Sequence, residues 1–318
     1  MTKRGRIFFH APCFDGAVSA AIAADFLTET ERWTAALPSG INYGMARPWV
    51  RASNNTPFAI VDFVFSPRAE LWADHHLTTF ESSAARRTFK SRRSKLWIYD
   101  PSAPSCAQLL WEHFKAAFDY RNRHFREIVG WATKIDSATY RSVHEVFESS
   151  HPALSLNLAL SQFTPKDCER LVTLLRKADL EEAARDPKVK AAAARARKLS
   201  ERGLKRFKQA ARLEDDIVVF DVDPGGTIVN RYAPYRFFPN ARYSAGIIRG
   251  KDQIKITAMR NPWKEFRSAP LGEIFQTHGG GGHRRVASVV LKHGAARHAD
   301  AVLADVVSTI RAQDLLVS

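Results

Sequence analysis

Cysteine is scarce in this sequence: only Cys13, Cys106 and Cys168 occur, and they lie far apart. So few cysteines at such spacings exclude a disulfide framework, and there is no Cys-x-x-Cys pair of the kind that holds a structural zinc ion. Free cysteines are typical of compartments that keep thiols reduced. We therefore expect a cytoplasmic protein.

Long apolar runs are also lacking. No stretch approaches the roughly 18 consecutive apolar residues that span a bilayer, so we expect no membrane span and at most a peripheral role at a membrane. The start of the chain has a basic head and an apolar middle, but His10 and Asp15 interrupt the apolar part. We therefore interpret it as mature protein and not as a secretion signal.

Acidic residues are outnumbered by basic ones. The chain has 48 lysines and arginines against 33 aspartates and glutamates, a formal net charge of +15. Such a field attracts polyanions, so nucleic acid, nucleotides and anionic membrane surfaces are the candidate partner classes. The charge alone does not choose among them.

The length of 318 residues favours two domains. Short apolar segments alternate with amphipathic ones in the first half, which predicts strands at 6–10, 58–65, 71–75 and 95–99 and helices at 15–27, 105–118 and 125–138. Alternation of this kind is typical of a parallel sheet covered by helices. We therefore expect an α/β N-terminal domain over residues 1–163.

Residues 164–216 are rich in Ala, Lys and Arg and contain one glycine, Gly203, which predicts a helical connector. Its basic part, 188–212, either follows a nucleic-acid backbone or only presents charge to solvent. A smaller α/β C-terminal domain is expected over 217–318. Its predicted strands lie at 217–222, 242–249, 253–259 and 286–291, with a hairpin between the second and third, and its helices at 271–277 and 300–315.

Acidic residues and histidines gather at the ends of the predicted strands of the first half. They are His10 with Asp15, then Asp62, then the run Asp74, His75 and His76, and also Asp136 in a helix. The carboxyl ends of parallel strands meet at one edge of a sheet, so side chains distant in sequence can converge there. Oxygen and imidazole ligands suit Mn²⁺ or Mg²⁺, and a pair of such ions about 3.5 to 4 Å apart can activate water against a phosphate ester.

Five motifs carry a resemblance to a known family: HAPCFDGAVSAA, IVDFVFS, ADHH, GWATKID and GGGGHRR. In this order they resemble the DHH phosphoesterase superfamily. The glycine motif is similar to that of the DHH-associated C-terminal domain, which the nucleotide-cleaving branches carry, so the resemblance covers nearly the whole chain. The related pyrophosphatase branch is disfavoured because its second domain lacks this motif.

The resemblance implies a dinuclear manganese centre, with Mg²⁺ as the alternative ion. The implied metal ligands are His10, Asp15, Asp62, His75 and Asp136, with Asp62 bridging the two ions and His10 serving the second one. The implied catalytic residues are His76, beside the scissile phosphate as acid or electrostatic stabiliser, and Asp74, which orients the histidines. The implied substrate-binding residues are Ser105, Arg260, Gly280, Gly281, Gly282, His283 and Arg284.

One position departs from the family pattern. Members commonly carry an aspartate two residues before the one that matches Asp15, and this chain has Cys13 there. A thiolate can bind metal, but manganese prefers oxygen, so either the first ion is weakly held or the thiol only packs. The departure puts the count of two metals in doubt.

The expected function is that of a manganese-dependent phosphodiesterase or phosphatase, acting through metal-activated water on short single-stranded oligonucleotides or small nucleotides. Two alternatives remain open: a single-strand exonuclease that processes longer nucleic acid, and a nucleotide-binding regulatory protein with weakened catalysis. The sequence leaves open whether the protein is a monomer or a homodimer.

Overall fold

The computed structural model describes residues 3–50, 56–92, 94–148, 150–251, 253–292 and 297–315. The chain forms two compact units. Unit 1 comprises residues 1–140 and 150–195, and unit 2 comprises residues 141–149 and 196–318. The 24-residue helix α9 (Pro187–Ala210) begins in unit 1 and ends in unit 2.

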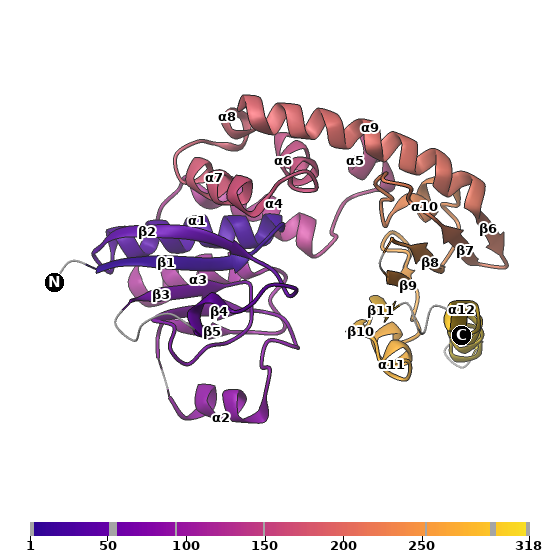
Figure 1. The fold of residues 1–318 in the computed structure, drawn as a ribbon, viewed down its shortest axis with the longest axis horizontal. Helices are drawn as coiled ribbons and strands as arrows, with labels where there is room; N and C mark the ends of the chain where they lie inside the picture. Colours follow the sequence, from indigo (N-terminus) through magenta and orange to yellow (C-terminus); the bar gives the residue numbers. More distant parts are fainter. Residues whose placement is uncertain are drawn as a thin grey trace. The chain divides into compact units, whose positions relative to one another are not determined.

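Unit 1 is built on a five-stranded sheet (Figure 1). Its strands are β1 (Lys3–His10), β2 (Trp33–Ile41), β3 (Phe58–Val61), β4 (Leu71–Asp74) and β5 (Trp97–Tyr99), in the order β2-β1-β3-β4-β5. All neighbouring pairs are parallel, so every strand ends at the same edge. The strand order reverses between β1 and β3, and such a switch point is where α/β sheets form crevices.

The helices of unit 1 begin with α1 (Phe14–Glu29), which is buried on nearly all sides because its residues are mostly apolar and small. The others are α2 (Ser83–Ser91), α3 (Cys106–Phe118), α4 (Phe125–Asp136), α6 (Pro152–Leu160), α7 (Pro165–Leu175) and α8 (Leu180–Arg185), with a short 3-10 turn η1 (Pro48–Val50). An aromatic cluster that includes Phe8 and Trp72 packs with Phe89 of α2. The centre of the sheet is therefore enclosed, which leaves its carboxyl edge for polar side chains.

Unit 2 contains a six-stranded mixed sheet. Its strands are β6 (Ala211–Glu214), β7 (Ile217–Val222), β8 (Tyr243–Arg249), β9 (Gln253–Arg260), β10 (Gly281–His283) and β11 (Val286–Lys292), in the order β10-β11-β9-β8-β7-β6. Only β7 and β8 are parallel. Its helices besides the end of α9 are α5 (Val143–Glu148), α10 (Ala233–Phe237), α11 (Leu271–Gln276) and α12 (Ala299–Leu315). The hairpin of β8 and β9 confirms the predicted turn.

The α/β class predicted from the sequence is confirmed by both sheets. Strand β2 was not predicted, because Pro38 and Gly40 interrupt its pattern. An edge position tolerates both, since only one side of β2 has to pair. The strand predicted over 58–65 is too long, because Asp62 takes a left-handed backbone conformation (φ 54°) that ends β3.

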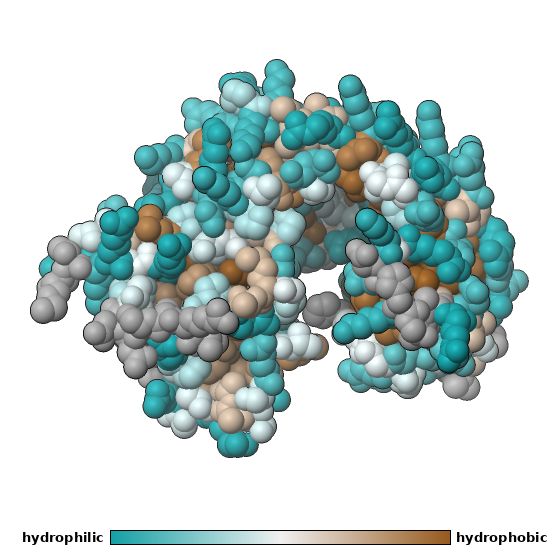
Figure 2. Space-filling view, in the orientation of Figure 1, coloured by the Kyte–Doolittle hydropathy of each residue, from teal (hydrophilic) through white to brown (hydrophobic). Residues whose placement is uncertain are grey.

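Helix α9 lies within the expected connector 164–216, together with α7, α8 and β6. Its single glycine, Gly203, is required by packing, because an added Cβ would lie 2.0 Å from the carbonyl oxygen of Ile228. Figure 2 shows mainly hydrophilic side chains over this helix. Within the described ranges, no helix combines the length and apolar character needed to cross a bilayer.

Candidate metal centre

Asp62 is the central residue of the candidate site. Its side chain is 1% exposed, and neither carboxylate oxygen has a hydrogen-bond partner among the described residues. Its backbone is also strained, since a non-glycine residue rarely adopts a positive φ outside functional sites and turns. A buried carboxylate without a donor is costly, so this position requires a compensating positive group.

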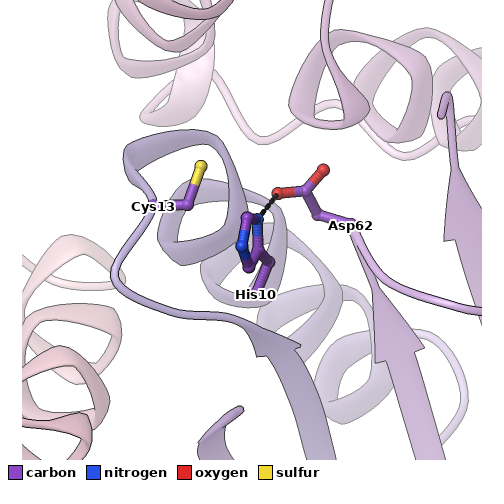
Figure 3. A group of neighbouring side chains, drawn as sticks. All are labelled: His10, Cys13 and Asp62. Carbon is purple, nitrogen blue, oxygen red and sulfur yellow. Dashed lines mark ion pairs between the residues drawn. The ribbon is translucent and has the colours of Figure 1, made fainter. Parts of the chain in front are cut away.

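His10 and Cys13 approach Asp62 from the end of β1 and the start of α1 (Figure 3). His10 Nδ1 lies 3.6 Å from Asp62 Oδ2. One ligand atom of each of the three residues lies within 4.8 Å of the other two, which is compatible with a shared cation. Burial and the charge of His76 lower the pKa of His10, which favours the neutral imidazole that binds metals.

His75 faces Asp62 from the other side. Its Nδ1 lies 2.9 Å from the carbonyl oxygen of Ala103 and must therefore carry the proton, which leaves the lone pair on Nε2. This Nε2 lies 3.4 Å from Asp136 Oδ2, 3.8 Å from Asp62 Oδ1 and 3.9 Å from Asp15 Oδ2. A backbone carbonyl that fixes the tautomer in this way is typical of metal-binding histidines.

Asp15 is held by the amino terminus of α3. Its carboxylate accepts hydrogen bonds from the backbone N–H groups of Cys106 (2.7 Å) and Ala107 (2.9 Å). The partial positive charge at a helix amino terminus stabilises a carboxylate in this position. The neighbouring Gly16 packs against β1, because an added Cβ would lie 2.2 Å from the carbonyl oxygen of His10.

Asp74 fixes the position of His76. The Asp74 carboxylate is fully buried, and its Oδ1 lies 2.7 Å from His76 Nδ1 and accepts hydrogen bonds from the backbone N–H groups of both His75 and His76. Burial alone would lower the pKa of His76, but the hydrogen bond and charge of Asp74 raise it. The ring is thus anchored at Nδ1, with Nε2 left to face a ligand.

The carboxylates of the site repel one another. Burial and the charge of Asp136 raise the pKa of Asp15 to about 7. Burial and the charges of Asp15, Asp74 and Asp136 raise the pKa of Asp62 well above its usual value. Several buried acids of raised pKa around one point are typical of a site that binds a cation.

The donor atoms fit a divalent metal. Three overlapping groups lie within ligand distance: His10, Cys13 and Asp62; Asp62, His75 and His76; and Asp15, His75 and Asp136. Three buried atoms that lack a hydrogen-bond partner, Asp62 Oδ1, Asp62 Oδ2 and His75 Nε2, belong to residues of these groups. All five residues predicted as metal ligands are thus brought together, although their separation in sequence is large.

The predicted substrate-binding residues lie in several places. Ser105 is buried at the start of α3, where its hydroxyl accepts the Gln108 N–H and contacts Thr133. Arg260 is 8% exposed and donates to the carbonyl oxygens of Lys264 and Phe266, so it holds the loop that follows β9. Both residues have internal partners that the sequence pattern could not reveal.

The glycine loop leads into the edge strand β10. Gly280 and Gly282 are required by packing, since an added Cβ would lie 2.5 Å from the Ser288 carbonyl oxygen and 2.4 Å from that of Val286, respectively. Gly281, by contrast, faces open space. Arg284 follows as an exposed residue, and the His283 side chain lies outside the described part of the structure.

A cavity of about 340 Å³ in unit 2 is lined by Gly281, Gly282, Arg231 and Lys255. Among the described residues, no carboxylate pairs with either of these cations. Partial burial and the charge of Arg231 lower the pKa of Lys255, although the residue as a whole remains exposed. The sequence did not single out Lys255, because only folding places this strand residue beside Arg231.

Tyr43 is a further residue that the sequence did not single out. Its ring is 50% exposed and lies 5.5 Å from the His10 ring and 4.6 Å from the Phe63 ring, measured between centroids. Arg47 lies over Phe63 at 4.9 Å. An exposed aromatic ring and a cation therefore lie beside the His10 part of the metal centre.

Neither a protein-family model nor a curated protein matches the chain. Solved structures do. The pGpG-specific phosphodiesterase PggH from Vibrio cholerae is 20% identical with a TM-score of 0.65, over 96% of this chain and 99% of that one. An exopolyphosphatase-related protein from Bacteroides fragilis is 13% identical with a TM-score of 0.53, over 96% and 92%. RecJ from Thermus thermophilus in complex with Mn²⁺ is 15% identical with a TM-score of 0.59, over 97% and 52%.

The chain shares the fold of these solved structures. The order of the motifs agrees with this fold, because the DHH run itself lies at the end of β4 and the glycine motif enters the sheet of unit 2 as β10. At this level of identity the likeness concerns the architecture alone, and the chemistry depends on the residues of the centre.

Proposed function

We propose that this protein is a divalent-metal-dependent phosphoesterase that hydrolyses phosphate esters of short oligonucleotides or small nucleotides. The observation that carries the proposal is the Asp62 carboxylate, which is buried without a donor and surrounded by imidazole and carboxylate groups. Such a cluster is stable when a cation lies among its members, and divalent cations are the common means of hydrolysing phosphate esters in water.

The residues that would hold the metal form two groups around Asp62. Asp15, His75 and Asp136 form one, and His10 with Cys13 forms the other. When bound, divalent cations in this position polarise a phosphoryl oxygen and lower the pKa of a coordinated water. Mn²⁺ and Mg²⁺ both suit the oxygen-rich group, and the RecJ structures of this fold contain one or the other.

His76 acts on the ester itself in this proposal. Its ring is fixed at Nδ1 by Asp74, and its Nε2 side remains available to a ligand because the residue is only partly buried. From Nε2 it donates a hydrogen bond to a phosphoryl oxygen or a proton to the leaving oxygen. General-acid catalysis of this kind typically contributes about 10² to 10⁴ in rate.

A nucleotide is the substrate class that unit 2 suits best. Arg231 and Lys255 line its cavity without a carboxylate partner, so they provide positive charge for phosphate groups. In unit 1, the exposed Tyr43 ring beside His10 offers a surface on which a base can stack. The almost complete coverage of both chains in the likeness to PggH supports a short substrate.

Longer single-stranded nucleic acid is the second candidate substrate, and helix α9 favours it. The helix has one acidic residue, Glu201, against exposed basic residues along its length, namely Lys188, Lys190, Arg195, Arg197, Lys198, Arg202, Lys205, Arg206 and Lys208. Such a surface can follow a phosphate backbone. The third candidate, a binding protein with weakened catalysis, rests on Cys13 in the place of an acidic ligand.

One substrate panel tests all three candidates. The full-length protein is incubated with labelled di- to pentanucleotides including pGpG, a 3′,5′-bisphosphate nucleotide and a long single strand, with Mn²⁺, with Mg²⁺ and after chelation. Fast metal-dependent turnover of the shortest substrates supports the proposal, and rates that rise with length support the exonuclease. Saturable binding without turnover supports the binding protein. If the protein neither binds nor hydrolyses any of these substrates, the proposal is removed.

Asp62→Asn provides the matching variant. It removes the central charge while keeping the size of the side chain, so turnover is expected to be abolished. Asp119→Asn is the control, because Asp119 has the same left-handed backbone (φ 52° against 54°) but lies at the exposed end of α3. Equal activity of the two variants would contradict the assignment of Asp62.

A further inference from the structure

The two groups of donors beside Asp62 differ in chemistry. His10, Cys13 and Asp62 offer nitrogen, sulfur and oxygen, whereas Asp15, His75 and Asp136 offer one nitrogen and two carboxylates. Sulfur ligands favour zinc and iron, and imidazole suits both, whereas sets of oxygen ligands favour Mg²⁺ and Mn²⁺. The centre is therefore chemically asymmetric even though its two halves lie side by side.

The position of Cys13 distinguishes it from the other two cysteines. It occupies the N-cap of α1, its side chain makes no capping hydrogen bond there, and it is partly exposed. Cys106 is fully buried and its thiol donates to the Ala73 carbonyl oxygen, while Cys168 is buried in α7. Cys13 is thus the one cysteine of the described ranges that shares a ligand-distance group with a histidine and an aspartate.

A second observation points to a ligand at the same place. Asp62 is 1% exposed, and neither of its oxygens has a hydrogen-bond partner. In Figure 3 a dashed line joins the His10 ring to the Asp62 carboxylate, and Cys13 lies beside them. Three protein ligands leave a coordination position for water or substrate, as in catalytic zinc sites.

We propose that His10, Cys13 and Asp62 form a thiolate-containing subsite that selects a divalent cation of the zinc, ferrous and cobalt class over Mn²⁺, beside an oxygen-rich subsite that accepts Mn²⁺ or Mg²⁺. On binding, the thiol proton leaves to solvent and the sulfur bonds to the cation. The inference rests on the proposed function, because it assigns an identity to one of the ions that function requires.

Cobalt is the probe that tests the subsite without any assay of turnover. The reduced, metal-free, full-length protein is titrated with Co²⁺ under anaerobic conditions, and the near-ultraviolet thiolate-to-cobalt charge-transfer band is recorded together with the visible ligand-field bands. We expect the charge-transfer band to saturate at one ion per chain. Zn²⁺ should displace it, and an equal concentration of Mn²⁺ should not.

Two variants and one control assign the band. Cys13→Ser should remove it and weaken Zn²⁺ binding by at least about tenfold. Loss of a residue that only hydrogen-bonds to a metal ligand typically lowers metal affinity by about 10- to 100-fold, and loss of a ligand itself should lower it at least as much. Cys13→Asp should remove it and raise the affinity for Mn²⁺ at the same subsite. Cys168→Ala should keep it, and circular dichroism confirms that each variant is folded.

The outcomes separate this inference from the proposed function. Cobalt binding with ligand-field bands but without the thiolate band overturns the inference alone, as does a band that persists in Cys13→Ser. If no divalent cation binds in equilibrium dialysis, the inference and the proposed function both fall. Metal-dependent turnover by a protein without the thiolate band would leave the proposed function intact.

Discussion

His10 Nδ1 and Asp62 Oδ2 lie 3.6 Å apart, although the two residues stand on opposite sides of the point where the strand order of unit 1 reverses. His10 ends β1 and Asp62 follows β3, so their contact spans the crevice of the sheet. A cation placed between them therefore also links the two halves of the sheet. Metal binding should stabilise the fold as well as serve chemistry.

The contact of Asp74 with His76 predicts a loss of turnover without a loss of metal. Asp74→Asn removes the charge that anchors Nδ1 of His76 but leaves the metal ligands in place. We expect kcat to fall by about 10- to 100-fold, as is common for such supporting residues. Steady-state kinetics and metal stoichiometry measured on the same preparation check this. A variant that loses its metal instead would show that Asp74 acts on the ligands.

Gly16 predicts a packing constraint on the centre. In Gly16→Ala, the new methyl group would meet the His10 carbonyl oxygen at 2.2 Å. We expect the free energy of unfolding to fall by about 1 to 3 kcal/mol and metal affinity to fall with it. Gly130→Ala is the matched control, because Gly130 lies exposed in α4 with nothing near its would-be Cβ. That change should stabilise the protein by about 0.5 to 1 kcal/mol in thermal or urea unfolding.

Substitutions at Gly281 and Gly280 should separate effects on substrate binding from effects on the stability of unit 2. Gly281→Ala places a methyl group in open space at the edge of the cavity, so the melting temperature should not change. KM for a nucleotide substrate should rise several-fold if a phosphate approaches the backbone there. Gly280→Ala should instead lower the melting temperature, because its methyl group would clash with β11. An unchanged KM in Gly281→Ala would place the ligand elsewhere.

Arg231 and Lys255 predict that substrate binding depends on salt. Changing both to Gln removes two positive charges from the cavity, so KM should rise and its dependence on ionic strength should weaken, while kcat changes less. Changing the exposed Lys251 and Lys292 together to Gln serves as the control for net charge, because it also removes two positive charges. Equal effects of the two changes would indicate only a general attraction to the basic protein.

Asp167 predicts an acid-sensitive contribution to stability. A hydrogen bond from Lys188 lowers the pKa of Asp167 from 3.8 to about 2, and Asp167 also accepts hydrogen bonds at the start of α7. Because the folded pKa is the lower one, this stabilisation is complete above about pH 4 and disappears as the pH falls towards about 2. Asp167→Asn should lower the free energy of unfolding by about 1 kcal/mol at neutral pH and flatten that part of the pH profile. Urea unfolding at several pH values measures this, with Lys188→Gln as the partner variant in a double-mutant cycle.

The convergence of the metal ligands could be anticipated because strand ends obey a topological rule. His10, Asp62 and His75 all follow apolar runs, and a parallel sheet brings such ends to one edge. Strand β2 could not be anticipated in the same way, since Pro38 and Gly40 are ordinary signs of a loop. Its place at the sheet edge, which tolerates them, is a property of the tertiary fold.

Side-chain pairings that form only on folding could not be predicted from the sequence. The sequence does not show that Arg260 donates to the loop after β9, or that Arg231 and Lys255 share a cavity. The left-handed backbone of Asp62 could not be predicted either, because non-glycine residues rarely adopt a positive φ. Local patterns therefore predict elements and chemistry, while exposure and partners emerge from packing.

The order in which the ligands occur along the chain has a consequence for synthesis. His10, Cys13 and Asp62 are all present once β3 has been made, whereas the group of Asp15 and His75 waits for Asp136 at the end of α4. A nascent chain emerging from the ribosome thus acquires its sulfur-bearing ligands first. In a cell where zinc and manganese compete for new proteins, these cations would therefore encounter the Cys13 thiol before the carboxylate-rich group exists.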